Sequence, residues 1–317
     1  MQAAPFHRLD GDAESPARAF WLRADDGVRL RAALWRAPDG PPARGTVLLF
    51  PGRTEYLEKY DRVARDLLAA GFAVLGIDWR GQGASDRLLD DPRPGHVAAF
   101  ADYQRDVVEL IVAAQKLSLP QPWHLLAHSM GGAIGLAALH DGLPVVSAAF
   151  SAPMWGIRNP LPPVLAQGVA AAASAIGLRR RTVPGSGGRG QQTYVLSAGF
   201  ADNLLTPCPA NWSRLVTEAA FWPDLTLGGA TFGWVATALA ESARLSHLPA
   251  PDLPALASLG SDEQIVSPPA IRQRIADWPG ARLVSIDGAR HEVLFDTPAR
   301  RDLFLNAALD LFGRHGG

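Results

Sequence analysis

One short stretch, Trp123–Gly135, constrains the fold of this chain more than any other. It begins as the apolar run WHLLA, which predicts a buried strand, and it ends in small and apolar residues with the spacing of a helix. Ser129 lies on the turn between them. A serine on a sharp strand-to-helix turn is the pattern of a nucleophile elbow, which requires small residues two positions before and two positions after the serine. Ala127 and Gly131 meet that requirement, although glycine is more usual than alanine at the first position.

Taken alone, this motif also fits an ordinary turn that carries an incidental serine. The pattern of strands and helices in the rest of the chain distinguishes the two interpretations. A β-hairpin is predicted at 17–36, around the turn Asp25–Gly27. After it, predicted strands alternate with predicted helices, which favours right-handed crossovers and a parallel sheet. The strands are 46–50, 72–77, 123–127, 145–150, 254–259 and 281–286, the helices are 57–70, 96–117, 133–139, 268–278 and 298–312, and a loop is predicted at 38–44. We therefore expect an α/β fold with a mostly parallel sheet flanked by helices.

The alternation is interrupted once, by a long segment between two predicted strands. Residues 154–245 contain proline clusters, a glycine-rich loop at 184–190 and several aromatic-bearing stretches of helical character. A helical insertion of this length between two strands of a sheet is typical of a cap or lid. The expected organisation is a core formed by residues 1–153 and 246–317, with an inserted helical cap at 154–245.

Two later loops supply the partners that a nucleophilic serine needs. The loop after the strand at 254–259 contains the adjacent carboxylates Asp262 and Glu263, and the loop after the strand at 281–286 contains His291. The order serine, acid, histidine is that of the α/β-hydrolases, and all three loops follow the carboxyl ends of predicted parallel strands. We expect His291 to take the proton of Ser129 and a carboxylate to hold the imidazole. The alternative for His291 alone is a structural hydrogen bond within its loop.

An acyl-transfer site also needs two backbone N–H groups that stabilise an oxyanion. Met130, directly after the serine, is expected to supply one of them. The turn after the strand at 46–50 contains Gly52, which allows close backbone approach, and the Arg53 amide is the candidate for the second. His128 is interpreted as structural or pocket-lining.

Composition limits the classes of protein that need be considered. A formal net charge of −1 over 317 residues argues against nucleic-acid binding. The single cysteine, Cys208, excludes an intrachain disulfide and is compatible with a reducing compartment. The sequence has neither a signal-peptide pattern at its start nor an apolar run long enough to span a bilayer. These features predict a soluble, cytoplasmic protein, whose oligomeric state stays open.

Four motifs resemble those of the monoglyceride lipase and lysophospholipase group of α/β-hydrolases. They are FPGRTEYLEKY at 50–60, IDWRGQGAS at 77–85, HVAAFADYQRDV at 96–107 and AHSMGG at 127–132. The Pro-Gly-Arg-x-Glu form is more similar to the bacterial lysophospholipases than to the lipases, which carry His-Gly-x-Gly-Glu. The resemblance implies glycerolipid or lysophospholipid esters as substrates and neither a metal nor an organic cofactor. The family spacing of the acid loop favours Glu263 over Asp262 as the triad acid.

The cap adds hypotheses about substrate and membrane. Trp155, Phe232 and Trp234 are expected to line an acyl pocket, or else to pack the cap on the core. The apolar segment 164–178 followed by Arg179–Arg181 suggests contact with the inner face of a phospholipid membrane, while the simpler alternative is that these arginines complement a helix dipole. Two other functions stay open: an aminopeptidase or amide hydrolase on the same fold, and a binding protein that has lost catalysis.

Overall fold

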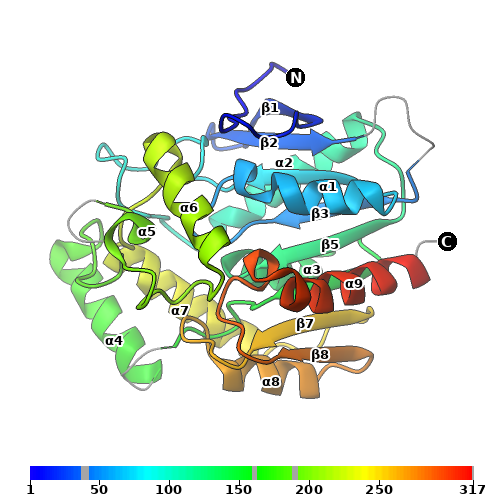
Figure 1. Cartoon of the computed structure of the whole chain (residues 1–317). Helices are drawn as coiled ribbons and strands as arrows, with labels where there is room; N and C mark the ends of the chain where they lie inside the picture. Colours follow the sequence, from blue (N-terminus) through cyan, green and yellow to red (C-terminus); the bar gives the residue numbers. More distant parts are fainter. Residues whose placement is uncertain (37–42, 159–162, 188–191, 316–317) are drawn as a thin grey trace.

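The computed structural model describes residues 1–36, 43–158, 163–187 and 192–315. The predicted loops at 38–44 and 184–190 therefore lie partly outside the described residues. Its centre is an eight-stranded sheet with the strand order β1-β2-β4-β3-β5-β6-β7-β8 (Figure 1). The hairpin strands β1 and β2 are antiparallel, and β4 joins β2 antiparallel; all other neighbours are parallel. The strands are β1 Ala17–Arg23, β2 Arg29–Trp35, β3 Thr46–Phe50, β4 Ala73–Asp78, β5 Trp123–His128, β6 Ser147–Ser151, β7 Ala255–Gly260 and β8 Ala281–Ile286.

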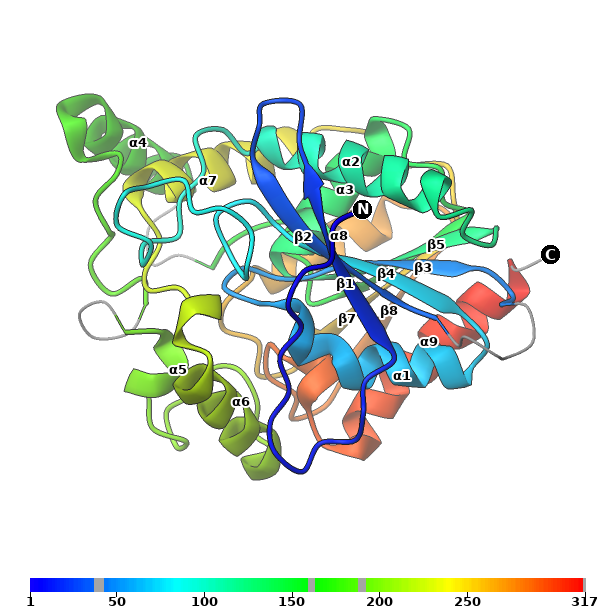
Figure 2. The same ribbon diagram turned by 90° about the horizontal axis from the view of Figure 1, so that it is seen from above.

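Helices cover both faces of the sheet, because its central strands are apolar on both sides. Every residue of β3, β4, β5, β6 and β7 is buried, as expected for parallel strands between two helical layers. One apolar core joins the sheet to α2, α3 and α8, and a second core joins its other face to α1 and α9 (Figure 2). These helices are α1 Asp61–Ala69, α2 Asp102–Lys116, α3 Met130–His140, α8 Pro268–Ala276 and α9 Pro298–Arg314. The predicted α/β architecture, a mostly parallel sheet flanked by helices, is confirmed.

The strand register brings the carboxyl ends of the parallel strands to one edge. Phe50 of β3 pairs with Ala127 of β5, and His128 pairs with Ser151 of β6. At the far side of the sheet, Gly260 of β7 pairs with Ile286 of β8. The four loops that follow β3, β5, β7 and β8 therefore emerge at the same edge, although more than two hundred residues separate the first from the last.

One predicted helix begins later than expected. The pattern of residues 96–117 predicted a continuous helix, but α2 begins only at Asp102. Gly95 instead forms a parallel bridge with Ala230, and the His96 imidazole bonds the Thr231 hydroxyl at 2.8 Å. These contacts with the inserted segment hold residues 95–97 in an extended path, and tertiary pairing overrides the local helical pattern there.

The regular elements between β6 and β7 are helices joined by loops, and the name cap is kept for residues 154–245. In Figure 1, α4, α5, α6 and α7 gather at the end of the sheet to which the parallel strands point. Helix α7 packs against both α3 of the core and α4. The cap contains α4 Pro163–Ala173, η2 Ser174–Leu178, α5 Tyr194–Ser197, α6 Pro209–Phe221, η3 Pro223–Leu225 and α7 Phe232–Ser246. Among the helices of the described residues, none is long and apolar enough to cross a membrane.

Candidate active site

The turn between β5 and α3 holds Ser129 in a strained conformation. Its φ of 49° and ψ of −116° are unusual for a residue with a side chain, and such strain occurs preferentially at functional sites. Three backbone hydrogen bonds hold the turn. The Ser129 N–H donates to the carbonyl of Ser151 at 3.0 Å, and the amides of Gly132 and Met154 both donate to the Ser129 carbonyl at 2.8 Å.

Small residues after the serine let helix α3 pass closely over the sheet. A β-carbon at Gly131 would overlap the carbonyl oxygen of Phe50, which is backbone and cannot move aside. A β-carbon at Gly132 would lie 2.6 Å from that of Pro153. The sequence requirement for a small residue two positions after the serine therefore has a direct steric cause in the neighbouring strand end.

The structure brings Ser129, His291 and Glu263 into one hydrogen-bonded series. The Ser129 Oγ lies 2.9 Å from Nε2 of His291, and Nδ1 of the same imidazole lies 2.8 Å from Oε2 of Glu263. All three residues are buried, with 7% or less of their surface exposed. Both distances lie within normal hydrogen-bond range, so the imidazole contacts the serine on one side and the carboxylate on the other, the arrangement that an activated nucleophile requires.

Of the two adjacent carboxylates, Glu263 reaches the histidine and Asp262 does not. The second oxygen of Glu263, Oε1, accepts the backbone amides of Ile265 at 2.6 Å and Val266 at 3.0 Å, which fixes the carboxylate plane. Asp262 is exposed and accepts a hydrogen bond from the Ser261 hydroxyl at 3.1 Å. The tight turn after β7 thus directs the first carboxylate to solvent and the second into the site.

The two ionisable partners change each other's protonation equilibrium. Burial works to lower the pKa of His291, but the charge of Glu263 and its hydrogen bond outweigh burial and hold that pKa above its usual value. Burial likewise works to raise the pKa of Glu263, and the charge of His291 with the hydrogen bonds to Glu263 holds it below the usual range. Both directions favour an imidazolium–carboxylate pair, the state that forms when the histidine accepts a proton.

The two amides expected to stabilise an oxyanion have no acceptor among the described residues. Met130 occupies the first position of α3, where backbone N–H groups lack an intrahelical partner and the helix dipole favours negative charge. The Arg53 amide lies in the loop after β3 and is similarly free. Gln82 braces this loop: its amide nitrogen donates to the Gly52 carbonyl at 2.8 Å, and its oxygen accepts the Thr54 amide at 3.3 Å.

Behind His291 lies a buried charged network that the sequence reasoning did not predict. The Lys59 ammonium lies between two carboxylates: it bonds Glu55, which also accepts the Gly52 amide, and it lies 2.8 Å from Glu292. The Nε2 of His128 lies 3.5 Å from Glu292, while Nδ1 bonds the Ser151 carbonyl at 3.0 Å. The only hints in the sequence were the i, i+4 spacing of Glu55 and Lys59 and the position of Glu292 next to His291.

This network also contains the donor set closest to a metal site among the described residues. One ligand atom each from Glu55, His128 and Glu292 lies within 4.8 Å of the others. The Lys59 ammonium, however, forms ion pairs with both carboxylates and thereby balances their negative charge. Burial would raise the pKa of Glu55, but the Lys59 charge outweighs burial and holds it at about 2. Through these two ion pairs, Lys59 links the loop after β3 to the loop that carries His291.

The three aromatic residues expected to line an acyl pocket lie in different surroundings. Trp155 packs in the core against Phe150, at a centroid distance of 5.0 Å, and donates to the Gly132 carbonyl at 3.1 Å. This packing argues against the predicted pocket-lining role of Trp155. Phe232 is half-buried at the start of α7. Trp234, two residues further along, is buried and donates to the Tyr103 hydroxyl at 3.3 Å.

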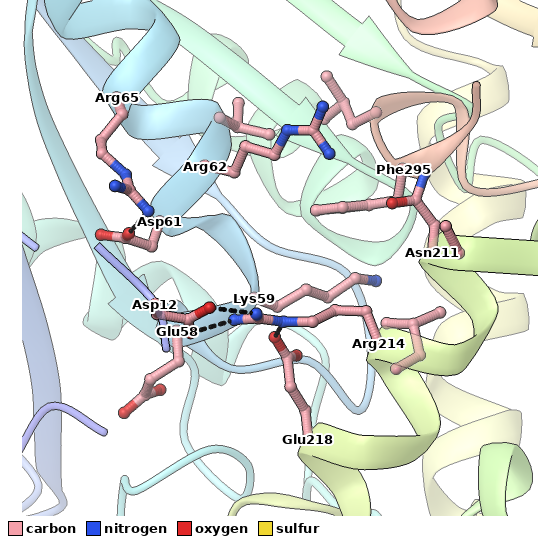
Figure 3. A pocket seen from close by; sticks show the side chains of 14 residues that line it. Asp12, Glu58, Lys59, Asp61, Arg62, Arg65, Asn211, Arg214, Glu218 and Phe295 are labelled. Carbon is pink, nitrogen blue, oxygen red and sulfur yellow. Dashed lines mark hydrogen bonds and ion pairs between the residues drawn. The ribbon is translucent and has the colours of Figure 1, made fainter. Parts of the chain in front are cut away.

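A cavity of about 360 Å³ lies between the core helix α1 and the cap helix α6 (Figure 3). None of Ser129, Glu263 and His291 lines it. Its walls carry ion pairs: Figure 3 shows Arg214 between Asp12, at 2.6 Å, and Glu218. Charged walls of both signs are a poor environment for an acyl chain, because burying an apolar chain there would desolvate these groups without replacing their partners.

Comparison with known proteins agrees with this architecture. A monoglyceride lipase from Saccharomyces cerevisiae has the same fold, with a TM-score of 0.74 and 20% identity over 98% of this chain and 99% of that structure. A carboxyl esterase from Bacillus coagulans has a TM-score of 0.71 at 13% identity, over 96% of this chain and 100% of that structure. The eight-stranded sheet and the strained serine turn at its edge define an α/β-hydrolase.

Sequence relatives narrow the class further. The profile of the serine aminopeptidase S33 family matches residues 41–298, and the chain belongs to this family. Lysophospholipase L2 of Escherichia coli K12 is 33% identical over 95% of this chain and 91% of that protein. Human monoglyceride lipase is 32% identical, but over only 35% of this chain and 34% of that protein. The chain is a hydrolase.

Proposed function

We propose that this protein hydrolyses the acyl ester bond of lysophospholipids, with Ser129, His291 and Glu263 as its catalytic triad. The observation that carries the proposal is the continuous hydrogen-bonded series from the Ser129 Oγ through His291 to Glu263. A strained, buried serine bonded to an oriented imidazole has the geometry of an activated nucleophile.

The proposed reaction proceeds through an acyl-enzyme. His291 Nε2 accepts the Ser129 proton while Oγ attacks the ester carbonyl, and the amides of Arg53 and Met130 donate to the resulting oxyanion. The C–O bond to the glycerol moiety then breaks, and the imidazolium returns the proton to that leaving oxygen. Water, activated by the same imidazole, attacks the acyl-serine and releases the fatty acid. Throughout, Glu263 accepts the Nδ1–H bond and stabilises the imidazolium.

The extent of similarity favours a lysophospholipid over a monoacylglycerol as the substrate. The similarity to lysophospholipase L2 extends over 95% of this chain, and therefore includes the cap, which is expected to select the substrate. The similarity to human monoglyceride lipase covers 35% of the chain. Monoacylglycerol stays the second ester substrate that the same chemistry would accept.

The carboxylates of the cap argue against the alternative function of an aminopeptidase. Such an enzyme needs a free carboxylate near the nucleophile to bind the substrate's ammonium. Glu218 is bonded to Arg214, and Glu241 forms an ion pair with Arg244 at 2.7 Å. Asp202 is exposed on the surface. None of these three carboxylates is therefore both buried and free to bind the ammonium group of a substrate. For this reason we do not propose amide hydrolysis.

The purified protein is expected to release fatty acid from 1-acyl lysophospholipid, to act more slowly on the monoacylglycerol of the same chain length, and to leave aminoacyl amides uncleaved. Product release measured by mass spectrometry on the three substrates tests this ranking. Faster turnover of an aminoacyl amide than of either ester would contradict the proposed function. Absence of turnover on all three, with an intact fold, would instead favour a binding protein without catalysis.

We further propose that the cap docks on an anionic membrane surface. Leu165 and Val169 lie one turn apart on α4, and with Ile176 they expose 57%, 55% and 76% of their surface. Shortly after them come Arg180 and Arg181, which are exposed. Exposed apolar side chains beside basic residues are the pattern of an interfacial contact. Arg179 differs, because its guanidinium bonds the Ala98 carbonyl of the core.

Replacing Arg180 and Arg181 with glutamine is expected to weaken binding to anionic vesicles. Each basic residue at such a surface contributes about 1 kcal/mol, so the double variant should bind about 30-fold more weakly at low salt. Vesicle co-sedimentation measures the effect, and turnover of a soluble short-chain ester should not change. Arg105→Gln, which removes an exposed charge beside Asp25 of the distant hairpin, is the matched control. Equal binding of the double variant and the wild type would exclude this surface.

A further inference from the structure

The side chain of Arg53 is a partly buried cation that forms no ion pair with a described carboxylate. Its Nε is buried and has no hydrogen-bond partner among the described residues. Among the described residues, the guanidinium has one acceptor, the Gly228 carbonyl, which lies 3.5 Å from Nη2, the upper limit for a hydrogen bond. A guanidinium carries five N–H donors, so the described part of the chain leaves most of them without an acceptor.

Two buried arginines, Arg31 and Arg80, show how a guanidinium is balanced by carboxylates in this protein. Arg31 forms ion pairs with Glu58 at 2.6 Å and with Asp78 at 2.7 Å. Arg80 likewise pairs with Asp106 and Asp26, each at 2.7 Å. Arg53 forms no such ion pair with a described carboxylate. Buried charges are normally paired, because removing an ion from water costs several kcal/mol.

The groups that contact the Arg53 guanidinium do not include a carboxylate of the described residues. The Trp234 ring lies 4.8 Å from its guanidinium carbon, a cation–π contact that leaves the N–H donors at the edge of the guanidinium unused. A β-carbon at Gly95 would lie 2.5 Å from Nη2, so the guanidinium lies close against the backbone of this loop. Burial lowers the pKa of Arg53 to about 10, which leaves the side chain protonated at neutral pH.

Neighbouring charges are also positive. His96 follows Gly95, and its pKa is lowered by burial and by the nearby cations Arg179 and Arg180. The Arg179 guanidinium bonds the Ala98 carbonyl on the same core loop. An anion at Arg53 would therefore meet a positive field and no competing carboxylate from these residues.

We propose that the Arg53 guanidinium binds the phosphodiester of the lysophospholipid headgroup. This inference rests on the proposed function and names the part of the substrate, its phosphodiester, that the site recognises. The backbone amide of the same residue is the candidate oxyanion donor, so its side chain starts beside the reacting ester and extends toward the cap. Only a glycerol moiety separates ester and phosphate in this substrate. Arginine matches phosphate oxygens with paired N–H donors.

The test is the ratio of kcat/KM for a lysophospholipid to that for the monoacylglycerol of the same short acyl chain, below the micellar concentration of both. Arg53→Met should lower this ratio about 10- to 100-fold, since it removes hydrogen bonds to a charged group, and Arg53→Lys should restore part of it. Arg105→Gln, which removes a distant exposed charge, should leave the ratio unchanged. An unchanged ratio in an Arg53→Met variant that still reacts with a fluorophosphonate overturns the proposal.

A second measurement uses the wild-type enzyme and does not depend on the variant folding. Glycerophosphoethanolamine should inhibit turnover of a soluble neutral ester competitively, while glycerol should not inhibit. Absence of inhibition overturns the proposal, and equal inhibition by inorganic phosphate overturns its assignment to the headgroup. If the wild type hydrolyses neither lipid, the proposed function fails, whereas the inhibition experiment with the soluble ester still tests Arg53 separately.

Discussion

Ser129→Ala is expected to lower kcat for ester hydrolysis by about 10⁶-fold, because the change removes the nucleophile and leaves only the oxyanion donors and substrate binding. His291→Ala should lower kcat by a similar factor, since without its base the Ser129 hydroxyl stays protonated. The double variant should be hardly slower than either single variant, because residues that act as one unit do not contribute additively. Initial rates at saturating substrate measure all three.

Ser151→Ala is the matched control for this loss. Ser151 ends the neighbouring strand β6, is also buried, and accepts the Ser129 amide at its backbone carbonyl. Its hydroxyl has no hydrogen-bond partner among the described residues, so its removal should change kcat only a few-fold. Comparable losses in Ser129→Ala and Ser151→Ala would indicate damage to the turn and would argue against a nucleophilic Ser129.

Glu263→Gln is expected to lower kcat by about 10⁴-fold, because an amide in place of the carboxylate permits the wrong tautomer of His291. Asp262→Asn changes the neighbouring carboxylate in the same way but should alter kcat only a few-fold, since that side chain is exposed and does not contact the histidine. Ester turnover at saturating substrate compares the pair. A crippled Asp262→Asn variant with an active Glu263→Gln variant would reverse the assignment of the acid.

The pH dependence of the same two variants gives an independent readout. The reaction needs neutral His291, so kcat/KM of the wild type should fall as pH decreases through the pKa of this histidine, which Glu263 holds above the ordinary value of about 6.5. Glu263→Gln removes the charge that raises the pKa, so the residual activity should persist to lower pH. Asp262→Asn should leave the midpoint unchanged. A midpoint that does not move in Glu263→Gln would contradict the proposed pairing.

The local features of the fold could be read from the sequence where a segment is defined by its own pattern. The apolar runs of the parallel strands and the turn at Asp25–Gly27 predicted β1 to β8 to within a few residues. The start of α2 could not be predicted in this way. The extended path of residues 95–97 depends on pairing with Ala230 and Thr231, more than a hundred residues away, and no local pattern encodes that contact.

In the candidate site, too, some residues could be predicted from the sequence and others could not. The order of Ser129, Glu263 and His291 after strand ends was sufficient to place them at one edge, because the topology of a parallel sheet dictates where its loops meet. Lys59 and the Arg53 side chain were not recognised, since their importance depends on which charges they meet after folding. Lys59 lies between Glu55 and Glu292. The Arg53 guanidinium instead contacts the Trp234 ring and forms no ion pair with a carboxylate of the described residues.

Mapping the residue that reacts with a lipid-like fluorophosphonate tests the central claim most directly. We expect a single modified peptide, carrying the label on Ser129, with labelling slowed by added lysophospholipid and absent from Ser129→Ala. Modification of a different residue, together with full hydrolytic activity of Ser129→Ala, would show that the nucleophile lies elsewhere and would contradict the account.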